Sequence, residues 1–535
     1  MKMKAYSLLL LLFIVTIGLI GCSNDSDSEN GNEKQDDGST GEETEAETSG
    51  GTLNLSIGQQ PNTIDPLVTT ATATAYAAKP IFETLVTVNE NYEVVPMLAE
   101  SFEESEDGKS IIFKLRKGVK FHNGNEMTAD DVLASMNRWL EMSQQASASI
   151  PGAKWEKIDE ETVELQLEKP SSIALYTVAE QNQVAAIMPK EIAESATEAG
   201  AEEYIGTGPF EFVEWKTDQY IHYKKFDDYQ SRTEPASGLA GEKKALVDEI
   251  YWNFVPDEST RISGLISGEY DISIGVAHDN VKQIEENEGI QPEIWTYGKE
   301  LLIFNKQQGV FADKNMRQAV NAALDFEGVL RASFGDEQFY ELEHGLFTPE
   351  IVNWYSDAGK EMYNQQDPEL TQSLLEEAGY DGEEIVILTS REYPHYYNAA
   401  VAVQQQLEKV GVNAKLDVFD WATLLDRRSD PELWDIFFTG WDTQVIPHGY
   451  NFLDSKAEYP GWTNSPELDQ YLEDISNATS QEEATAIAEQ LQEEFWDYLP
   501  LIILGLFKNT DGYSEKVQGF QNFIGPVLWN VSVEE

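Results

Sequence analysis

The chain switches repeatedly between strand-like and helix-like spacing of its hydrophobic residues. Residues 162–168 alternate apolar and polar side chains, which indicates a strand with one buried face. Residues 110–121 alternate on both sides of Lys117 and Gly118, and this pattern predicts a β-hairpin that turns at these two residues.

Helices are predicted where apolar residues recur every three to four positions behind a capping residue. Thr128 with Asp131, and Ser480 with Glu483, have the spacing of capping boxes at helix N-termini. Another helix is expected to end at Gly411 and to lead directly into a strand at residues 412–418. Helices that feed strands in this way are typical of α/β domains, so we expect an α/β fold.

The first 50 residues have a different character. A basic start is followed by the apolar run "SLLLLLFIVTIGLI" (residues 7–20), which is about the length of a secretory signal and too short for a comfortable membrane span. The tetrad Leu19–Cys22 resembles a bacterial lipobox, in which the cysteine is lipidated and becomes the first mature residue. We therefore expect a signal peptide at residues 1–21 and a lipid anchor on Cys22. The alternative is an ordinary signal peptide with an incidental cysteine.

Residues 22–50 are rich in Asp and Glu and hold no large apolar side chain. Such a segment buries too little surface to offset its ordering entropy, so a flexible tether is expected there. Residues 51–535 are long enough for two or more domains with sizeable cores.

The composition is strongly acidic. The chain has 96 Asp plus Glu against 36 Lys plus Arg, a formal net charge of −60. This charge argues against nucleic acid or an anionic lipid surface as partners. It is compatible with capture of cationic ligands, but we interpret it mainly as a device for solubility in a salty or alkaline habitat.

The sequence offers little catalytic chemistry. Cys22 is the only cysteine, which excludes an internal disulfide and leaves no thiol for catalysis. The motifs H-E-x-x-H and G-x-S-x-G are absent, and the six histidines lack metal-ligand spacing. We therefore expect no metal and no cofactor. Carboxylate pairs stay open as catalytic candidates, because so many acidic residues create pairs by chance.

Several stretches together resemble the family 5 extracellular solute-binding proteins, the peptide- and nickel-binding receptors of bacterial ABC importers. The longest is "LAESFEESEDGKSIIFKLRKGVKFHNGNEMTADDVLASMNRWL", Leu98–Leu140. The others follow in family order: "PNTIDP" (Pro61–Pro66), "IGTGPFEFVEW" (Ile205–Trp215), "SGEYDI" (Ser267–Ile272), "ADKNMRQAVNAALD" (Ala312–Asp325) and "LLEEAGY" (Leu374–Tyr380). The resemblance covers essentially everything after residue 51.

The resemblance implies a non-enzymatic receptor whose two α/β lobes close on a ligand. By analogy, residues 51–300 form the first part of lobe one, residues 301–500 form lobe two, and residues 501–535 return to lobe one. The crossings between lobes are placed near residues 297–305 and 500–508. Two crossings make a hinge. The expected partners are an ABC permease and its ATPase, for a monomer tethered outside the cytoplasm.

The clearest information on the ligand is in "FTGWDTQVIPHGYNFLD", Phe438–Asp454. In peptide-binding members a similar Gly-Trp segment usually carries an aspartate three residues after the tryptophan, which pairs with the peptide's α-amino group. Here that position is Gln444, and the only nearby carboxylate is Asp442. The candidate ligand-binding residues are Thr439, Gly440, Trp441 and Asp442, together with Arg391, Tyr393 and Trp421. Trp441 is equally compatible with core packing, and Asp442 with a solvated or helix-capping role.

Three functions remain open at this stage. The first is a peptide receptor of an ABC importer. The second keeps the class but changes the ligand to a nickel chelate, glutathione, an oligosaccharide or an opine, and the missing aspartate slightly favours it. The third is a secreted lipoprotein hydrolase with a carboxylate site, which would turn its substrate over instead of holding it.

Overall fold

The computed structural model describes residues 50–534, so Cys22, the expected signal peptide and all but the end of the expected tether lie outside the described residues. Within this range the largest sheet has 11 strands, of which ten follow the order β15-β14-β16-β12-β17-β11-β1-β10-β9-β8 and β13 pairs with β17. Their bounds are β1 Thr52–Ile57, β8 Phe210–Lys216, β9 Tyr220–Lys225, β10 Glu249–Phe254, β11 Ile272–Ser273, β12 Ile290–Phe304, β13 Tyr340–Glu341, β14 Ile385–Ser390, β15 Ala414–Phe419, β16 Ile436–Asp442 and β17 Leu501–Ser514.

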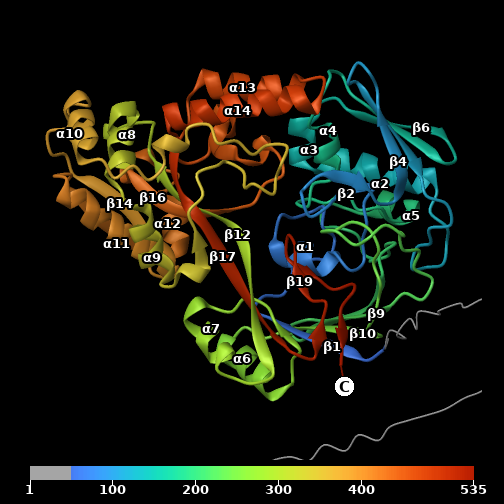
Figure 1. The fold of residues 1–535 in the computed structure, drawn as a ribbon. Coiled ribbons are helices and arrows are strands. Elements are labelled where there is room, and N and C mark those ends of the chain that lie inside the picture. Colours follow the sequence, from blue (N-terminus) through green and yellow to red (C-terminus); the bar gives the residue numbers. More distant parts are fainter. Residues whose placement is uncertain (1–49, 535) are drawn as a thin grey trace, which may run out of the picture. The chain divides into compact units, whose positions relative to one another are not determined.

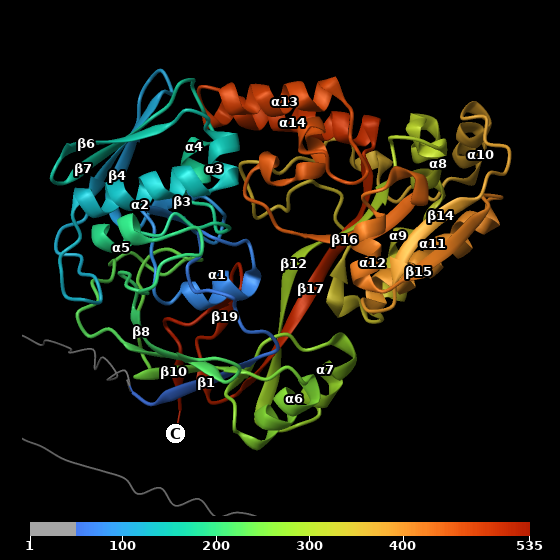
Figure 2. The same ribbon diagram turned by 180° about the vertical axis from the view of Figure 1, so that it is seen from behind.

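The two longest strands, β12 and β17, lie side by side and antiparallel at the centre of this sheet (Figures 1 and 2). The C-terminal half of β12 pairs with β16 from Gly298 onward, whereas the C-terminal end of β17 pairs with β11. The register between β12 and β17 shifts between Thr296 and Gly298 and again between Glu300 and Leu301. The two strands thus change neighbours along their length, at a place where their ladder is irregular.

A second sheet of the described region has four strands in the order β4-β5-β7-β6. They are β4 Ala99–Glu104, β5 Ser110–Leu115, β6 Lys154–Asp159 and β7 Thr162–Gln166. The predicted hairpin at Lys117–Gly118 is wrong, because β5 pairs with β4 and β7 and not with residues 119–121. Val119 and Phe121 are nevertheless buried, so their alternation reflects packing on the core without strand pairing.

The predicted helix starts are confirmed. Thr128 and Asp131 form the capping box of α2, and the Ser480 side chain accepts a hydrogen bond from the Glu483 N–H at the start of α14. The helix expected to end at Gly411 is α11, and it leads into β15. The helices are α1 Thr72–Ala78, α2 Ala129–Met142, α3 Gln144–Ser149, α4 Ala174–Val178, α5 Lys190–Ser195, α6 Glu258–Ser267, α7 His278–Glu285, α8 Lys314–Ala323, α9 Phe326–Phe334, α10 Pro368–Glu377, α11 Pro394–Lys409, α12 Trp421–Arg427, α13 Pro466–Asn477 and α14 Gln481–Tyr498.

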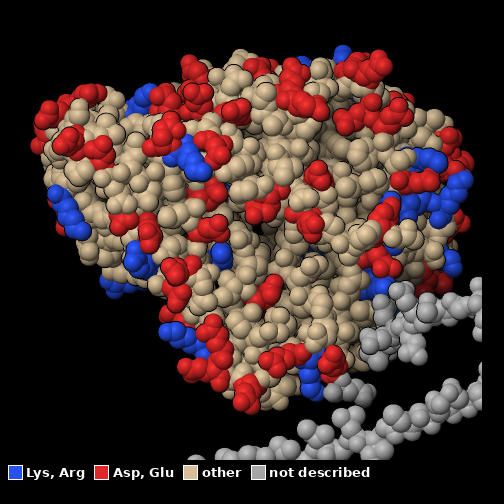
Figure 3. All heavy atoms as spheres, in the orientation of Figure 1, with Lys and Arg blue, Asp and Glu red and all other residues tan. Residues whose placement is uncertain are grey.

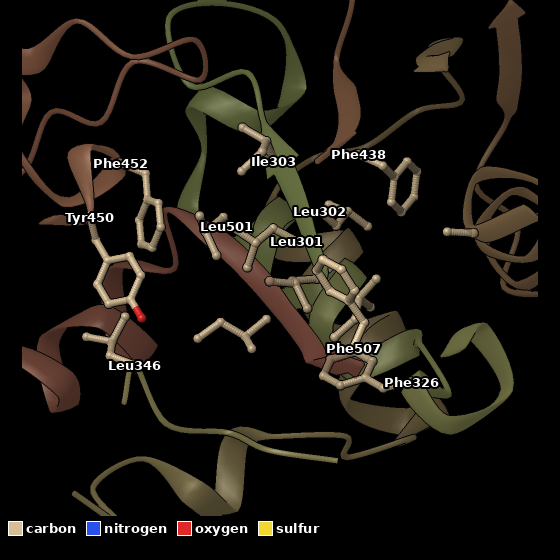
Figure 4. Packing of buried hydrophobic residues seen from close by; sticks show 14 of the residues in the cluster. Leu301, Leu302, Ile303, Phe326, Leu346, Phe438, Tyr450, Phe452, Leu501 and Phe507 are labelled. Carbon is tan, nitrogen blue, oxygen red and sulfur yellow. The ribbon is translucent and has the colours of Figure 1, made fainter. Parts of the chain in front are cut away.

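Buried hydrophobic residues of the described region gather around both sheets. One cluster surrounds β12, β16 and β17 and the helices from α8 to α14, a second covers the four-stranded sheet with α2, and a third surrounds β1, β9 and β10. Figure 4 shows Leu301 and Ile303 of β12 on the side of Tyr450 and Phe452, and Leu302 on the side of Phe438. This alternation buries both faces of the C-terminal half of β12, from Gly298 to Phe304.

Two motifs that carry the family resemblance meet in the interior. Asp65 of "PNTIDP" lies 2.6 Å from an Arg138 nitrogen of the 98–140 stretch, and both side chains are buried. The Asp65 carboxylate also accepts the backbone N–H groups of Leu67 and Ala201. These motif residues therefore build the scaffold.

Two further features of the described region are the spread of its surface charge and the character of its helices. On the face in Figure 3, Asp and Glu outnumber Lys and Arg and are spread widely, without a single dominant patch. No helix among residues 50–534 is both long enough and apolar enough to span a membrane. The spread of charge agrees with its interpretation as a solubility device.

Candidate ligand-binding site

Two adjoining cavities lie between segments that are distant in the sequence. The inner chamber has a volume of about 110 Å³ and the outer cleft about 1000 Å³. Thr72, Asn182, Tyr297 and Asp442 line both cavities. The outer cleft lies between residues 144–183 on one side and residues 441–477 on the other. Its volume is at the upper end of the range typical of small-molecule sites.

Direct contacts join the two sides beside these cavities. The Ser172 hydroxyl donates to the Ile475 carbonyl at 2.7 Å, and the rings of Tyr176 and Trp354 lie 5.9 Å apart. Asn182 and Asp442, one from each side, both line the junction of the two cavities. The cavities are therefore closed over by residues from both sides.

Strand β16 carries Asp442 to the junction of the two cavities. The strand is buried from Ile436 to Thr439 and becomes half-buried at its C-terminal end. Asp442 pairs with Gly298 of β12. A Cβ at Gly298 would lie 2.1 Å from the Trp441 carbonyl oxygen, so only glycine allows this approach of the two strands.

The Asp442 carboxylate is held by a neutral amide. The Gln444 side chain donates to the Asp442 Oδ1 at 3.1 Å, and Asn182 lines the same cavities. Burial raises the pKa of Asp442 above its ordinary value, and hydrogen bonding to the carboxylate opposes the shift. Gln444, at the position where peptide-binding members usually carry aspartate, thus orients Asp442.

Trp441 combines both roles considered from the sequence. Its ring packs edge-on against Phe452 at 5.3 Å and Tyr459 at 5.0 Å between centroids, and the residue is half-buried. It also lines the outer cleft. The side chain is therefore anchored in the core and still presents part of its surface to the cavity.

The other candidates do not line either cavity. Thr439 is buried, and the Gly440 N–H donates to the Tyr396 hydroxyl at 2.6 Å. Tyr396 in turn packs 5.8 Å from Trp421, whose ring lies 4.5 Å from that of Tyr393. Tyr393, Tyr396 and Trp421 thus form an aromatic cluster that reaches Gly440 through the Tyr396 hydroxyl and lies outside both cavities.

Arg391 is also away from the cavities. It is exposed, and its guanidinium stacks over the Tyr397 ring at 4.8 Å. The structure therefore brings Trp441 and Asp442 to the cavities and leaves Arg391, Tyr393 and Trp421 outside their walls.

Most residues of the inner chamber were missed from the sequence. Its walls include six aromatic side chains: Tyr76, Phe82, Tyr92, Trp295, Tyr297 and Trp529. They come from segments up to several hundred residues apart, and no local pattern connects them. The only available signal was the high aromatic content, which does not single out positions.

The chamber also holds charged groups that the sequence did not indicate. Glu180 lies on its wall, as does Lys79. Burial, with a smaller contribution from Lys243, lowers the pKa of Lys79 to about 7. Lys243 pairs with Glu83 at 3.2 Å. Both charge signs are therefore present around one small cavity.

No group of three or more His, Cys, Asp or Glu side chains suited to a metal ion occurs among residues 50–534. The polar lining of the cavities consists of amides, hydroxyls, carboxylates and lysines. These groups suit an organic ligand with polar and charged substituents.

Comparison with known proteins places this architecture in a family. A sequence model described as "Bacterial extracellular solute-binding proteins, family 5 Middle" matches residues 93–464. A probable peptide ABC transporter periplasmic-binding protein of Sinorhizobium fredii is 29% identical over 493 residues, which cover 87% of this chain and 91% of that protein.

Solved structures show the same two-lobed α/β fold. One is the protein AgaA from A. tumefacien R10 in complex with agropinic acid, with 27% identity, a TM-score of 0.70, and coverage of 91% of this chain and 99% of that one. Another is DppA from Helicobacter pylori in complex with the peptide STSA, with 25% identity, a TM-score of 0.70 and the same coverages. All three similar proteins are binding proteins by description.

Proposed function

The chain belongs to the bacterial extracellular solute-binding proteins of family 5, and from this premise we propose that it captures a peptide by closing two lobes and delivers it to an ABC permease. The observation that carries the proposal is the outer cleft of about 1000 Å³ between residues 144–183 and 441–477. A cleft of this volume accommodates a short peptide or a compound of similar size.

The lobes are proposed with the boundaries expected from the sequence. Lobe one comprises residues 51–300 and 501–535, and lobe two comprises residues 301–500. Strands β12 and β17 change neighbours near residues 296–300 and 507–512, which supports a hinge where they pass between the lobes. Closure is then a population shift driven by ligand contacts to both lobes.

Asp442 is proposed as the partner of a ligand cation, and Trp441 as a flat contact surface. The carboxylate lies at the junction of the two cavities and is desolvated there. A buried charge pair can be worth several kcal/mol, although removing one partner also exposes the cost of leaving the other unpaired. Calorimetry tests this role: the Asp442→Asn variant should bind at least about tenfold more weakly, about 1.4 kcal/mol. Binding within about twofold of wild type would show that Asp442 is not the anchor.

A non-peptide ligand is the second candidate. The observation that favours it is Gln444, which occupies the position where peptide-binding members usually carry the aspartate that receives the α-amino group. The agropinic-acid complex of AgaA, a protein 27% identical to this chain, supports an opine-like compound as one such ligand.

The cellular setting follows from the family. We propose that Cys22 is lipidated and that the acidic segment 22–50 tethers the receptor outside the cell membrane, close to its permease and ATPase. The receptor acts as a monomer and binds its ligand without chemical change.

The experiment uses residues 48–535, which form one compact unit with all three hydrophobic cores. The probe is a tryptic digest of casein, and bound peptides are identified by native mass spectrometry. Small-angle scattering should show compaction with the recovered peptide, and melting temperature should rise with its concentration. Recovery of shortened peptides would instead support a hydrolase. Absence of any bound peptide would overturn the peptide assignment, and opines would then be the next probes.

A further inference from the structure

Glu180 faces the same chamber as Asp442 but comes from the other lobe. It lies just after α4, on a segment of lobe one, whereas Asp442 ends β16 of lobe two. Both residues line the inner chamber, and Glu180 is buried. The cavity between the lobes therefore has one carboxylate on each of its two moving walls.

Asn182 lies beside both carboxylates. Its backbone N–H donates to the Glu180 Oε1 at 3.1 Å, and with Asp442 it lines both cavities. Burial raises the pKa of Glu180, and the charge of Asp442 adds a smaller contribution in the same direction. The two carboxylates thus lie on facing walls of one cavity.

Neither carboxylate has an ionic partner within the described residues. The Glu180 oxygens accept hydrogen bonds from the N–H groups of Gln181 and Asn182 and from the Gln145 side chain. Asp442 accepts a hydrogen bond from the Gln444 side chain. Amides orient a carboxylate without neutralising its charge. Closing the lobes therefore brings two like charges together in a site shielded from water, which is energetically unfavourable.

We propose that Glu180 and Asp442 act as a pair, one on each lobe, whose repulsion holds the unliganded receptor open until an ammonium or guanidinium group of the ligand enters between them. This inference rests on the proposed two-lobed capture function and adds Glu180 as a second determinant of ligand charge. The cation supplies the differential affinity for the closed state that closure requires.

Other charged and ionisable groups around the chamber limit how strongly the repulsion between Glu180 and Asp442 acts. The Lys79 ammonium donates hydrogen bonds to the carbonyls of Phe523 and Ile524, and Lys243 forms an ion pair with Glu83. The phenols of Tyr76, Tyr297 and Tyr450 have pKa values raised by burial and stay neutral near neutral pH. The Lys79 ammonium also lies over the Tyr76 ring, 5.6 Å from its centroid, and it gains charge as the pH falls through about 7.

The closed fraction of the ligand-free protein tests the proposal without requiring a known ligand. Residues 48–535 contain no cysteine, so spin labels can be attached to Ile158→Cys in lobe one and Val418→Cys in lobe two, both exposed in the structure. Distances between the labels then report the open and closed populations. At about pH 8, far above the ordinary pKa of a carboxyl group, the doubly labelled wild type should be mainly open.

Removing either charge should close the receptor without ligand. We expect Glu180→Gln to raise the closed-to-open ratio by about tenfold, and Asp442→Asn to act in the same direction. Two variants are used because Glu180→Gln would disturb the hydrogen bond from Gln145, and circular dichroism confirms that each is folded. Glu198→Gln, which removes an exposed charge from the same lobe, is the matched control and should leave the ratio unchanged.

The pH dependence separates the pair from Lys79. Lowering the pH from about 8 to about 5 favours protonation of carboxyls with raised pKa values and should shift the wild type toward closure. The double variant Glu180→Gln with Asp442→Asn should lose that part of the response and retain the part due to the other buried groups that titrate in this range, which are Lys79, Lys299 and Asp511 with pKa values of about 7, 8 and 6.

An unchanged closed-to-open ratio in both single variants would overturn the inference. If a casein peptide compacts the wild type while the variants leave the ligand-free ratio unchanged, the repulsion is refuted and the capture function stands. If no ligand compacts the protein but the variants close, the carboxylate pair stands and the peptide assignment fails.

Discussion

Glu300 should lower the stability of the protein at neutral pH. Its side chain is fully buried on β12, and neither carboxylate oxygen has a hydrogen-bond partner among residues 50–534. Its neighbours across the sheet are Gly440 and Gly505, which offer no side chain to pair with it. Burial raises the pKa of Glu300 well above its ordinary value.

The sign of the effect follows from this shift. A carboxyl whose folded-state pKa exceeds its unfolded-state value costs nothing at a pH below the unfolded value, because it is protonated in both states. As the pH rises from the unfolded pKa, about 4.3, toward the folded pKa, the unfolded chain ionises first, and stability falls by about 1.4 kcal/mol for each pH unit. Above the folded pKa the loss is constant.

The substitution Glu300→Met removes the ionisable group and keeps an unbranched side chain of similar size. Urea unfolding of residues 48–535 should show that the variant gains stability relative to wild type between about pH 4.5 and pH 7, by at least about 1.4 kcal/mol. Glu288→Gln, at an exposed position, serves as the control and should show no such pH-dependent gain. A difference between Glu300→Met and wild type that does not grow with pH would refute the reasoning.

Three further predictions concern the anchor, the cleft and the scaffold. Cys22→Ser should release the full-length protein from the membrane fraction or leave it uncleaved, and unchanged membrane retention would contradict lipidation. Trp441→Ala should weaken binding of the casein-derived peptide by about tenfold in calorimetry, because the cleft loses its flat wall, and a change below about twofold would assign Trp441 to packing alone. Asp65→Ala should lower the free energy of unfolding by about 3–5 kcal/mol, because the buried Arg138 guanidinium loses its ionic partner. Asp228→Ala breaks the exposed pair with Lys120 and should lower it by less than about 1 kcal/mol.

Local signals in the sequence were sufficient for the class of fold and for many of its elements. The box at Thr128 and Asp131 is confirmed, as is the helix that ends before Gly411, because caps and turns depend on neighbouring residues. The family resemblance was also carried by local stretches, including the one that holds Arg138. The hairpin at Lys117–Gly118 failed because alternation shows which residues are buried without showing which strand lies beside them.

The composition of the ligand site was decided by the tertiary structure. Asp442 could be proposed from the Gly-Trp segment that holds it, but Glu180, Lys79 and Trp529 have no local sequence feature that indicates a site. They become neighbours only because the tertiary structure brings segments far apart in the sequence to one cavity. Arg391 is nearer to Asp442 in the sequence than Glu180 is, and it still lies outside the cavities. Sequence spacing determines the local backbone, whereas closure of long loops determines which side chains share a cavity, and that depends on the packing of the whole chain.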